Sequence, residues 1–99
     1  MQLLFSRPVI PKCVSITFQG GFVGTRCSIQ IPSSTPGEWE VVAKIFPEDN
    51  NRPQNFTLTP DSPKALDGGV EKLKLTFEEG SDFFGRITIY DLRLEGDFP

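Results

Sequence analysis

The last third of the chain, Val70 to Gly96, constrains the fold most, because its apolar residues recur with the period of a β-strand. Leu73, Leu75 and Phe77 alternate with polar residues, which is typical of a strand with one buried side and one side in water. A second run of alternating residues follows shortly after it. This region therefore predicts two strands of a half-buried β-sheet.

The second of these strands changes phase along its length. Ile87 and Ile89 alternate with polar residues, and then Leu92 and Leu94 carry the apolar side one position out of step. Because a slip of one residue would turn the buried side outward, the strand pairing must absorb an extra residue. The sequence therefore predicts a β-bulge near Tyr90-Asp91.

Residues 78–85 connect the two strands and contain two adjacent phenylalanines, Phe83 and Phe84. One expectation is that one of these rings closes the end of the core. The alternative is contact with a ligand, which requires exposed aromatic side chains gathered in a patch.

Five shorter runs upstream show the same alternation. The strands expected there are Leu3–Phe5, Val14–Phe18, Cys27–Ile31, Trp39–Ile45 and Phe56–Leu58. Pro8 and Pro11 should end the first of them. The spacing in the fourth places Val41 on the apolar side and Trp39 there or at its edge.

The connections are rich in turn-forming residues, since the chain has nine Pro and nine Gly. This favours many turns and few helices. Gly20 and Gly21 can supply the positive φ that a tight turn needs after Phe18. Pro60–Gly69 is expected to be a long connection with room for one helical turn.

Length and charge restrict the class of protein. With 99 residues, the chain is expected to form a single domain, 1–99. A net charge of −3 without a cluster of Lys and Arg argues against direct nucleic-acid binding. No apolar run of about 18 residues suggests a membrane span. We expect no signal peptide, because the first residues show neither a positively charged leader nor a small-residue cleavage site.

The two cysteines, Cys13 and Cys27, do not make a disulfide framework. Because they are placed symmetrically about Gly20, a hairpin closing there could bring them face to face on neighbouring strands. The preferred expectation is that both are reduced and buried.

Residues typical of catalysis are scarce. The chain has no histidine and none of the common nucleophile, phosphate-loop or metalloprotease motifs. Glu48, Asp49 and Asn50 offer oxygen ligands, but their spacing matches no calcium loop and indicates a turn held by Asx-type hydrogen bonds. We therefore expect neither an enzyme nor a cofactor or metal site.

Four separated segments, in order, resemble a known family. They are Phe18–Phe22, Phe46–Asn51, Leu73–Glu78 and Asp82–Tyr90. Together they are similar to a family of nuclear-receptor-associated proteins that repress the orphan testicular receptor. The resemblance implies an all-β, antiparallel β-sandwich of the galactose-binding-like (discoidin-like) jelly-roll type. Since members of the family carry further strands before the position of Gln2, we expect a sandwich that is shortened at the N-terminus.

The resemblance also implies a function. It suggests a non-enzymatic protein-interaction module, a transcriptional co-regulator of the nucleus or cytoplasm that acts as a repressor by binding a nuclear receptor. The alternative is a carbohydrate-binding discoidin-like module, for which Trp39 would join the polar loop residues as a candidate. Fold alone does not choose between these functions.

The candidate partner-binding residues lie in two polar loops at the ends of expected strands. They are Glu48, Asp49, Asn50, Arg52, Asp82, Phe83 and Arg86. For Arg86 there is a second reading, in which it pairs with a carboxylate of Glu78 or Glu79 and only fixes its loop.

Overall fold

The computed structural model describes residues 1–58 and 69–98. The connection predicted over Pro60–Gly69, with its helical turn, lies outside these residues except for Gly69. The strands are β1 Gln2–Phe18, β2 Gly24–Pro32, β3 Trp39–Ile45, β4 Gln54–Thr57, β5 Val70–Gly80 and β6 Ile89–Asp97. Among the described residues, no helix has the length and apolar character needed to cross a membrane.

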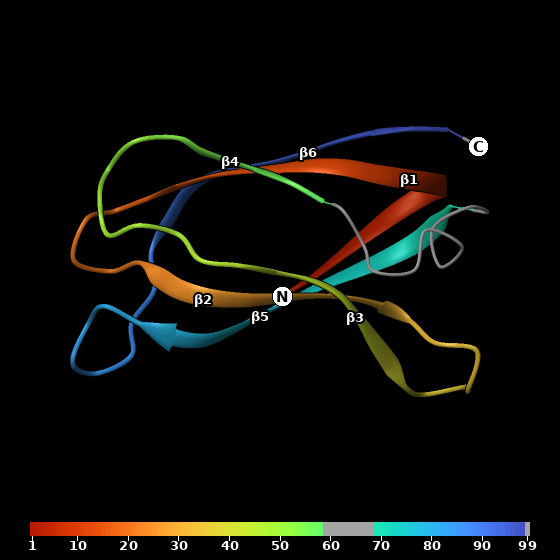
Figure 1. Cartoon of the computed structure of the whole chain (residues 1–99), viewed down its shortest axis with the longest axis horizontal. Coiled ribbons are helices and arrows are strands. Elements are labelled where there is room, and N and C mark those ends of the chain that lie inside the picture. The colour runs from red at the N-terminus through yellow and green to blue at the C-terminus, as the bar shows by residue number, and fades with distance from the viewer. Residues whose placement is uncertain (59–68, 99) are drawn as a thin grey trace.

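The strands form two antiparallel layers that share β1 (Figure 1). One layer has the order β3-β2-β5-β1, in which the first residues of β1 pair with β5. In the other layer, the second part of β1 lies between β4 and β6. The expected all-β antiparallel sandwich is therefore confirmed, whereas the galactose-binding-like type stays a prediction.

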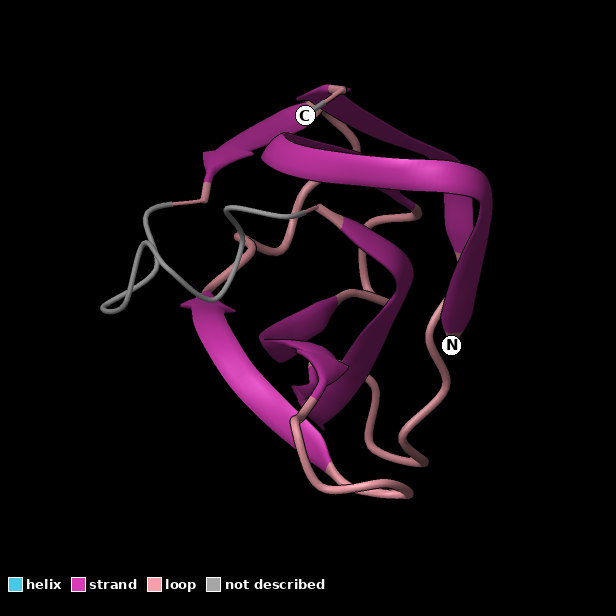
Figure 2. Cartoon of the chain, turned by 90° about the vertical axis from the view of Figure 1, so that its right-hand side faces the viewer, coloured by secondary structure: helices cyan, strands magenta, loops and turns pink. Residues whose placement is uncertain are grey.

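The two layers are connected by a bend in β1 (Figure 2). Its register against β5 shifts between Leu4 and Val9, so Pro8 lies in the interval where the pairing is interrupted. A proline is tolerated there because no pairing partner requires its missing N–H. The expectation that Pro8 and Pro11 end the first strand is wrong, because β1 continues through both to Phe18.

The bulge predicted in the last strand is confirmed. Thr17 pairs with Asp91 and Phe18 pairs with Ile89, so Tyr90 is the extra residue. The Tyr90 side chain is exposed, and the apolar residues on both sides of the bulge pack against the core. The strand itself begins at Ile89, two residues later than the apolar alternation suggested.

A second bulge, in β3, was not predicted. Ile29 pairs with Ala43, but Gln30 pairs with Val41, so Val42 is the extra residue. Val42 is 8% exposed and Val41 is 49% exposed, so the expectation that Val41 faces the core is wrong. The bulge reverses the sides of the residues before it, and Trp39 therefore shares the outer side with Val41.

The core consists of apolar side chains from both layers. The fully buried members contributed by strands are Val14, Ile16, Phe18, Cys27, Ile29, Leu73 and Leu75. Full burial of each Val, Ile, Leu or Phe side chain stabilises the folded state by roughly 1.5–3 kcal/mol. The Phe18 and Phe77 rings meet edge to face, with centroids 6.0 Å apart.

Both cysteines are free thiols, as expected. Cys27 is buried, and burial raises the pKa of its thiol to about 11. Cys13 is half-buried. The face-to-face arrangement across a hairpin is wrong, because Cys13 pairs with Thr57 and Glu95 while Cys27 pairs with Ile45 and Phe77.

Candidate functional site

Three loops meet at one end of the sandwich, which we call the loop end (left in Figure 1). The first is the β1–β2 turn (residues 19–23), the second is the β3–β4 loop (residues 46–53), and the third is the β5–β6 loop (residues 81–88). Main-chain hydrogen bonds join the first and third loops, from Gln19 N to Thr88 O and from Thr88 N to Phe22 O, each 2.9 Å long. The two predicted groups of binding residues therefore lie at the same end of the molecule.

The β3–β4 loop is attached to the β1–β2 turn by two side chains. Asp49 Oδ1 accepts a hydrogen bond from Gly21 N at 2.8 Å, and Asn51 Oδ1 accepts one from Gly20 N. Gly21 has a φ of 85°, a backbone conformation that side chains disfavour. The Asp49 carboxylate therefore has a structural role in addition to the predicted contact with a partner.

Local hydrogen bonds shape the rest of this loop, and they confirm the predicted Asx-type turn. Asn50 Oδ1 accepts from Arg52 N at 2.9 Å. The main chain of Glu48 is bonded to the Gln54 amide through both its N–H, at 2.7 Å, and its carbonyl, at 2.8 Å. Within the described ranges, no three His, Cys, Asp or Glu side chains gather as a metal site.

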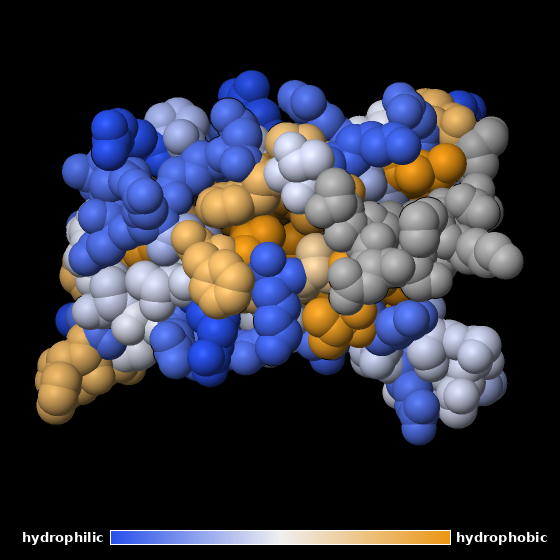
Figure 3. Space-filling model, viewed as in Figure 1, coloured by the Kyte–Doolittle hydropathy of each residue, from blue (hydrophilic) through white to orange (hydrophobic). Residues whose placement is uncertain are grey.

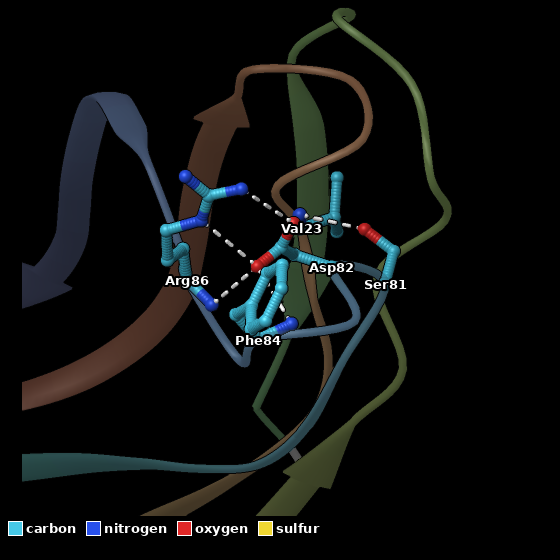
Figure 4. Close-up of polar contacts among 5 residues, drawn as sticks. All are labelled: Val23, Ser81, Asp82, Phe84 and Arg86. Atoms are coloured by element: carbon cyan, nitrogen blue, oxygen red, sulfur yellow. Dashed lines mark hydrogen bonds and ion pairs between the residues drawn. The ribbon is translucent and has the colours of Figure 1, made fainter.

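The β5–β6 loop is organised by Asp82 (Figure 4). Its Oδ2 accepts hydrogen bonds from Phe84 N at 3.0 Å, Arg86 N at 3.1 Å and Arg86 Nε at 3.0 Å. Its Oδ1 accepts from an Arg86 terminal nitrogen at 3.2 Å. The hydrogen bond from the Arg86 side chain, followed by those from the main chain, lowers the pKa of Asp82 below its ordinary value. The loop is thus held in one shape without burying its tip.

The pairing proposed between Arg86 and the Glu78-Glu79 turn is wrong. Arg86 bonds Asp82, and this partner raises the pKa of its guanidinium. Glu78 and Glu79 instead face Arg26, at 3.2 Å in each case. The loop-fixing role foreseen for Arg86 is retained, with a different carboxylate.

Phe83 and Phe84 project from this loop into solvent, 94% and 78% exposed. The interpretation that one of them closes the core is therefore wrong. Their rings pack edge to face with centroids 5.2 Å apart, and the Arg86 guanidinium lies 5.1 Å from the Phe22 ring and 5.6 Å from the Phe84 ring. Figure 3 shows apolar surface projecting at the lower left, the end where this loop lies. These side chains form a small exposed aromatic patch beside a cation.

Some residues of the loop end were not identified from the sequence. Phe22 contributes its ring to Arg86, and Ser81 ties the loop to Val23, whose N–H donates to Ser81 Oγ at 2.9 Å. The paired glycines before Phe22 were the available signal for a turn here. No pattern in the sequence linked Ser81 to Val23, because 58 residues separate them.

Trp39 lies away from this end. It is the first residue of β3, which begins near the opposite end of the molecule (Figure 1). The candidates named for carbohydrate binding are therefore divided, with Trp39 on the outer side of one sheet and the others at the loop end.

The fold and the loop end define an antiparallel β-sandwich with an exposed aromatic patch, an arrangement typical of binding modules. The chain is 42% identical over 95 residues to the zebrafish "Nuclear receptor 2C2-associated protein", with 96% of this chain and 62% of that relative covered. It is 40% identical over 84 residues to the human protein of the same name, with 85% of this chain and 55% of the relative covered. The mouse protein of that name is 39% identical over 93 residues, with 88% and 60% covered.

These matches confirm the resemblance that the four segments indicated. The chain spans 55% to 62% of the length of these curated relatives. No family model matches the chain, and no solved structure gives a significant match.

Proposed function

We propose that the chain is a non-enzymatic protein-interaction module that binds a nuclear receptor through its loop end and thereby represses transcription. The observation that carries this proposal is the exposed Phe83–Phe84 pair, presented on a loop that Asp82 and Arg86 hold in shape. The names of the relatives support association with a nuclear receptor. The site of action would be the nucleus or the cytoplasm.

The composition of the patch suits contact with a protein. Aromatic residues and Arg contribute most of the binding free energy in many protein interfaces, whereas flanking polar residues mainly exclude water. Phe83, Phe84 and Arg86 would form such a centre, with Glu48, Asn50 and Arg52 of the neighbouring loop at its rim.

The loop is also prepared for binding before a partner arrives. Because Asp82 already fixes Phe84 N and the Arg86 side chain, the loop main chain and Arg86 have less conformational entropy to lose on association. With a net charge of −3, the module would act by occupying a surface of the receptor rather than by holding DNA itself.

The test is a calorimetric titration of purified nuclear receptor 2C2 with the purified chain. We expect saturable binding by the native chain and a loss of affinity of at least about tenfold in the Phe83→Ser/Phe84→Ser variant. Phe98→Ser is the matched control, because Phe98 is 59% exposed and follows β6 at the other end of that strand.

Two results would reject the proposal. One is the absence of binding by the native chain, and the other is native affinity in the double variant. Circular dichroism of each variant shows whether the fold is retained, so a loss of binding cannot be confused with unfolding.

A further inference from the structure

A second exposed apolar patch lies on the outer side of the sheet β3-β2-β5-β1. The pairings Val41–Gln30, Gln30–Lys74 and Lys74–Gln2 form one row across all four strands. Trp39 opposite Pro32, and Lys72 opposite Leu4, lie two residues further along the same side. We call this surface the Trp39 patch, and its members are Leu4, Pro32, Trp39, Val41, Lys72 and Lys74.

The patch departs from what this side of a sandwich sheet normally presents. Outward-facing residues of a two-layer sheet alternate with core residues and are usually polar. Leu4 is 70% exposed and Val41 49% exposed, and the β3 bulge at Val42 is what turns Val41 and Trp39 outward. Bulges of this kind re-aim side chains, so the exposure is a specific feature of the backbone.

The other half of the same sheet surface is polar and internally paired. Arg26 lies 3.2 Å from carboxylate oxygens of both Glu78 and Glu79, and the Ser28 hydroxyl donates to Glu78. The hydrogen bond from Ser28 lowers the pKa of Glu78 below its ordinary value. The apolar exposure is therefore confined to the end of the sheet around Trp39.

The charge of the patch is opposite to that of the whole chain. Its only ionisable members are Lys72 and Lys74, and neither forms an ion pair with any described residue. Lys74 Nζ lies 5.2 Å from the centre of the Trp39 ring, which is cation–π contact. A hollow of about 400 Å³ adjoins the patch, lined by Ile31, Pro32, Gly69, Val70, Glu71 and Lys72.

We propose that the Trp39 patch binds an acidic peptide segment of a partner protein, one that carries apolar side chains between its carboxylates. The apolar side chains would lie on Leu4, Trp39 and Val41, and the carboxylates would meet Lys72 and Lys74. Such an arrangement removes exposed apolar surface from water. It also gives Lys72 and Lys74 carboxylate partners of opposite charge.

Charge also disfavours two other occupants. In a contact between two copies related by a two-fold axis, the same surface meets itself, so Lys72 and Lys74 would face their own equivalents. A nucleic-acid strand requires a track of cations along its phosphates, and this patch has two lysines within a chain of net charge −3. This surface is separate from the loop end, so the inference does not depend on the function proposed above.

The test uses the fluorescence of Trp39, the single tryptophan of the chain. The probe is a short synthetic peptide that alternates Asp with Leu and Phe, and the matched probe has Lys in place of each Asp. We expect a saturable change in emission with the acidic peptide alone. Lys72→Glu/Lys74→Glu should weaken that binding at least about tenfold, and added salt should weaken it in the native chain.

Lys12→Glu is the matched control, because Lys12 is an exposed lysine of β1 that is not part of the patch. It should leave the affinity for the acidic peptide unchanged. Equal binding of the acidic and basic peptides, or native affinity in the double lysine variant, would overturn the proposal. Self-association of the native chain in sedimentation experiments, if Val41→Asp abolishes it, would also overturn the proposal. Tighter binding of a single-stranded oligonucleotide than of the acidic peptide would do the same.

Discussion

Asp82 accepts three hydrogen bonds from Arg86, two from the guanidinium and one from the main-chain N–H. Asp82 Oδ2 accepts hydrogen bonds from both Arg86 Nε, at 3.0 Å, and Arg86 N, at 3.1 Å. The Asp82 side chain is 10% exposed, whereas that of Arg86 is 63% exposed. The carboxylate is therefore the structural member of the pair, and the guanidinium is the member available to a partner.

This asymmetry predicts unequal effects of substitution. Asp82→Ala should lower Tm more than Arg86→Ala does, because it removes the acceptor of main-chain N–H groups as well as the ion pair. Thermal unfolding followed by circular dichroism would measure both. Equal Tm values for the two variants would show that the main-chain hydrogen bonds to Asp82 contribute nothing.

The same carboxylate predicts a pH dependence. Because the pKa of Asp82 is lowered in the folded chain, the unfolded chain binds the proton more tightly, and acid favours unfolding. The stabilising contribution is complete above the ordinary pKa of 3.8 and is lost as the pH falls through the lower folded pKa. The Tm difference between the native chain and Asp82→Asn should therefore be constant near neutral pH and shrink in acid.

Lys12→Gln is the comparison for this experiment, since Lys12 is an exposed residue of β1 that lies outside the Asp82 loop. Its Tm difference from the native chain should change less than that of Asp82→Asn between neutral and acid pH. A constant difference for Asp82→Asn over the same range would contradict the lowered pKa.

The bulge in β3 predicts opposite outcomes for two adjacent valines. Val42→Asp places a carboxylate in the core and should destabilise the fold by several kcal/mol, on the order of the 3–5 kcal/mol typical of an unpaired buried charge. Val41→Asp changes an exposed side chain and should shift stability by less than about 0.5 kcal/mol. Urea unfolding would distinguish them, and the reverse order would mean that β3 pairs without the bulge.

The two thiols should differ in reactivity. Cys27 is fully buried with a pKa raised to about 11, so almost no thiolate is present at neutral pH. Cys13 is half-buried and should react first with a thiol reagent in the folded chain. Mass spectrometry after brief labelling would identify the modified residue, with Cys13→Ser as the control. Faster labelling of Cys27 would indicate that the sheet opens around it.

Much of the sheet could be predicted from alternation alone. The phase change between Ile89 and Leu92 was enough to predict the bulge at Tyr90, because both sides of it carry strong apolar patterns. In β3 the run of Val41, Val42 and Ala43 is apolar in either phase, so the sequence could not show which valine is buried. Because Val42 is the buried valine, Val41 and Trp39 both lie on the outer side of the sheet.

The candidate site was predicted in part. Turn-forming residues identified both polar loops, but the sequence carried no signal that Asp49 bonds Gly21 or that Asp82 selects Arg86. The exposure of Phe83 and Phe84 depended on whether the core was already full, which local sequence does not report.

The β class, most of the strands and the positions of the turns could be predicted from the amino-acid sequence, because alternation and turn chemistry act between residues that are close along the chain. Three other features became evident only in the folded chain: β1 passes through Pro8 to join both layers, three loops meet at one end, and Trp39 faces outward. These features arise from pairing between distant strands. Their register depends on contacts such as Ile29 with Ala43 and Leu3 with Leu73, which form only when the layers assemble.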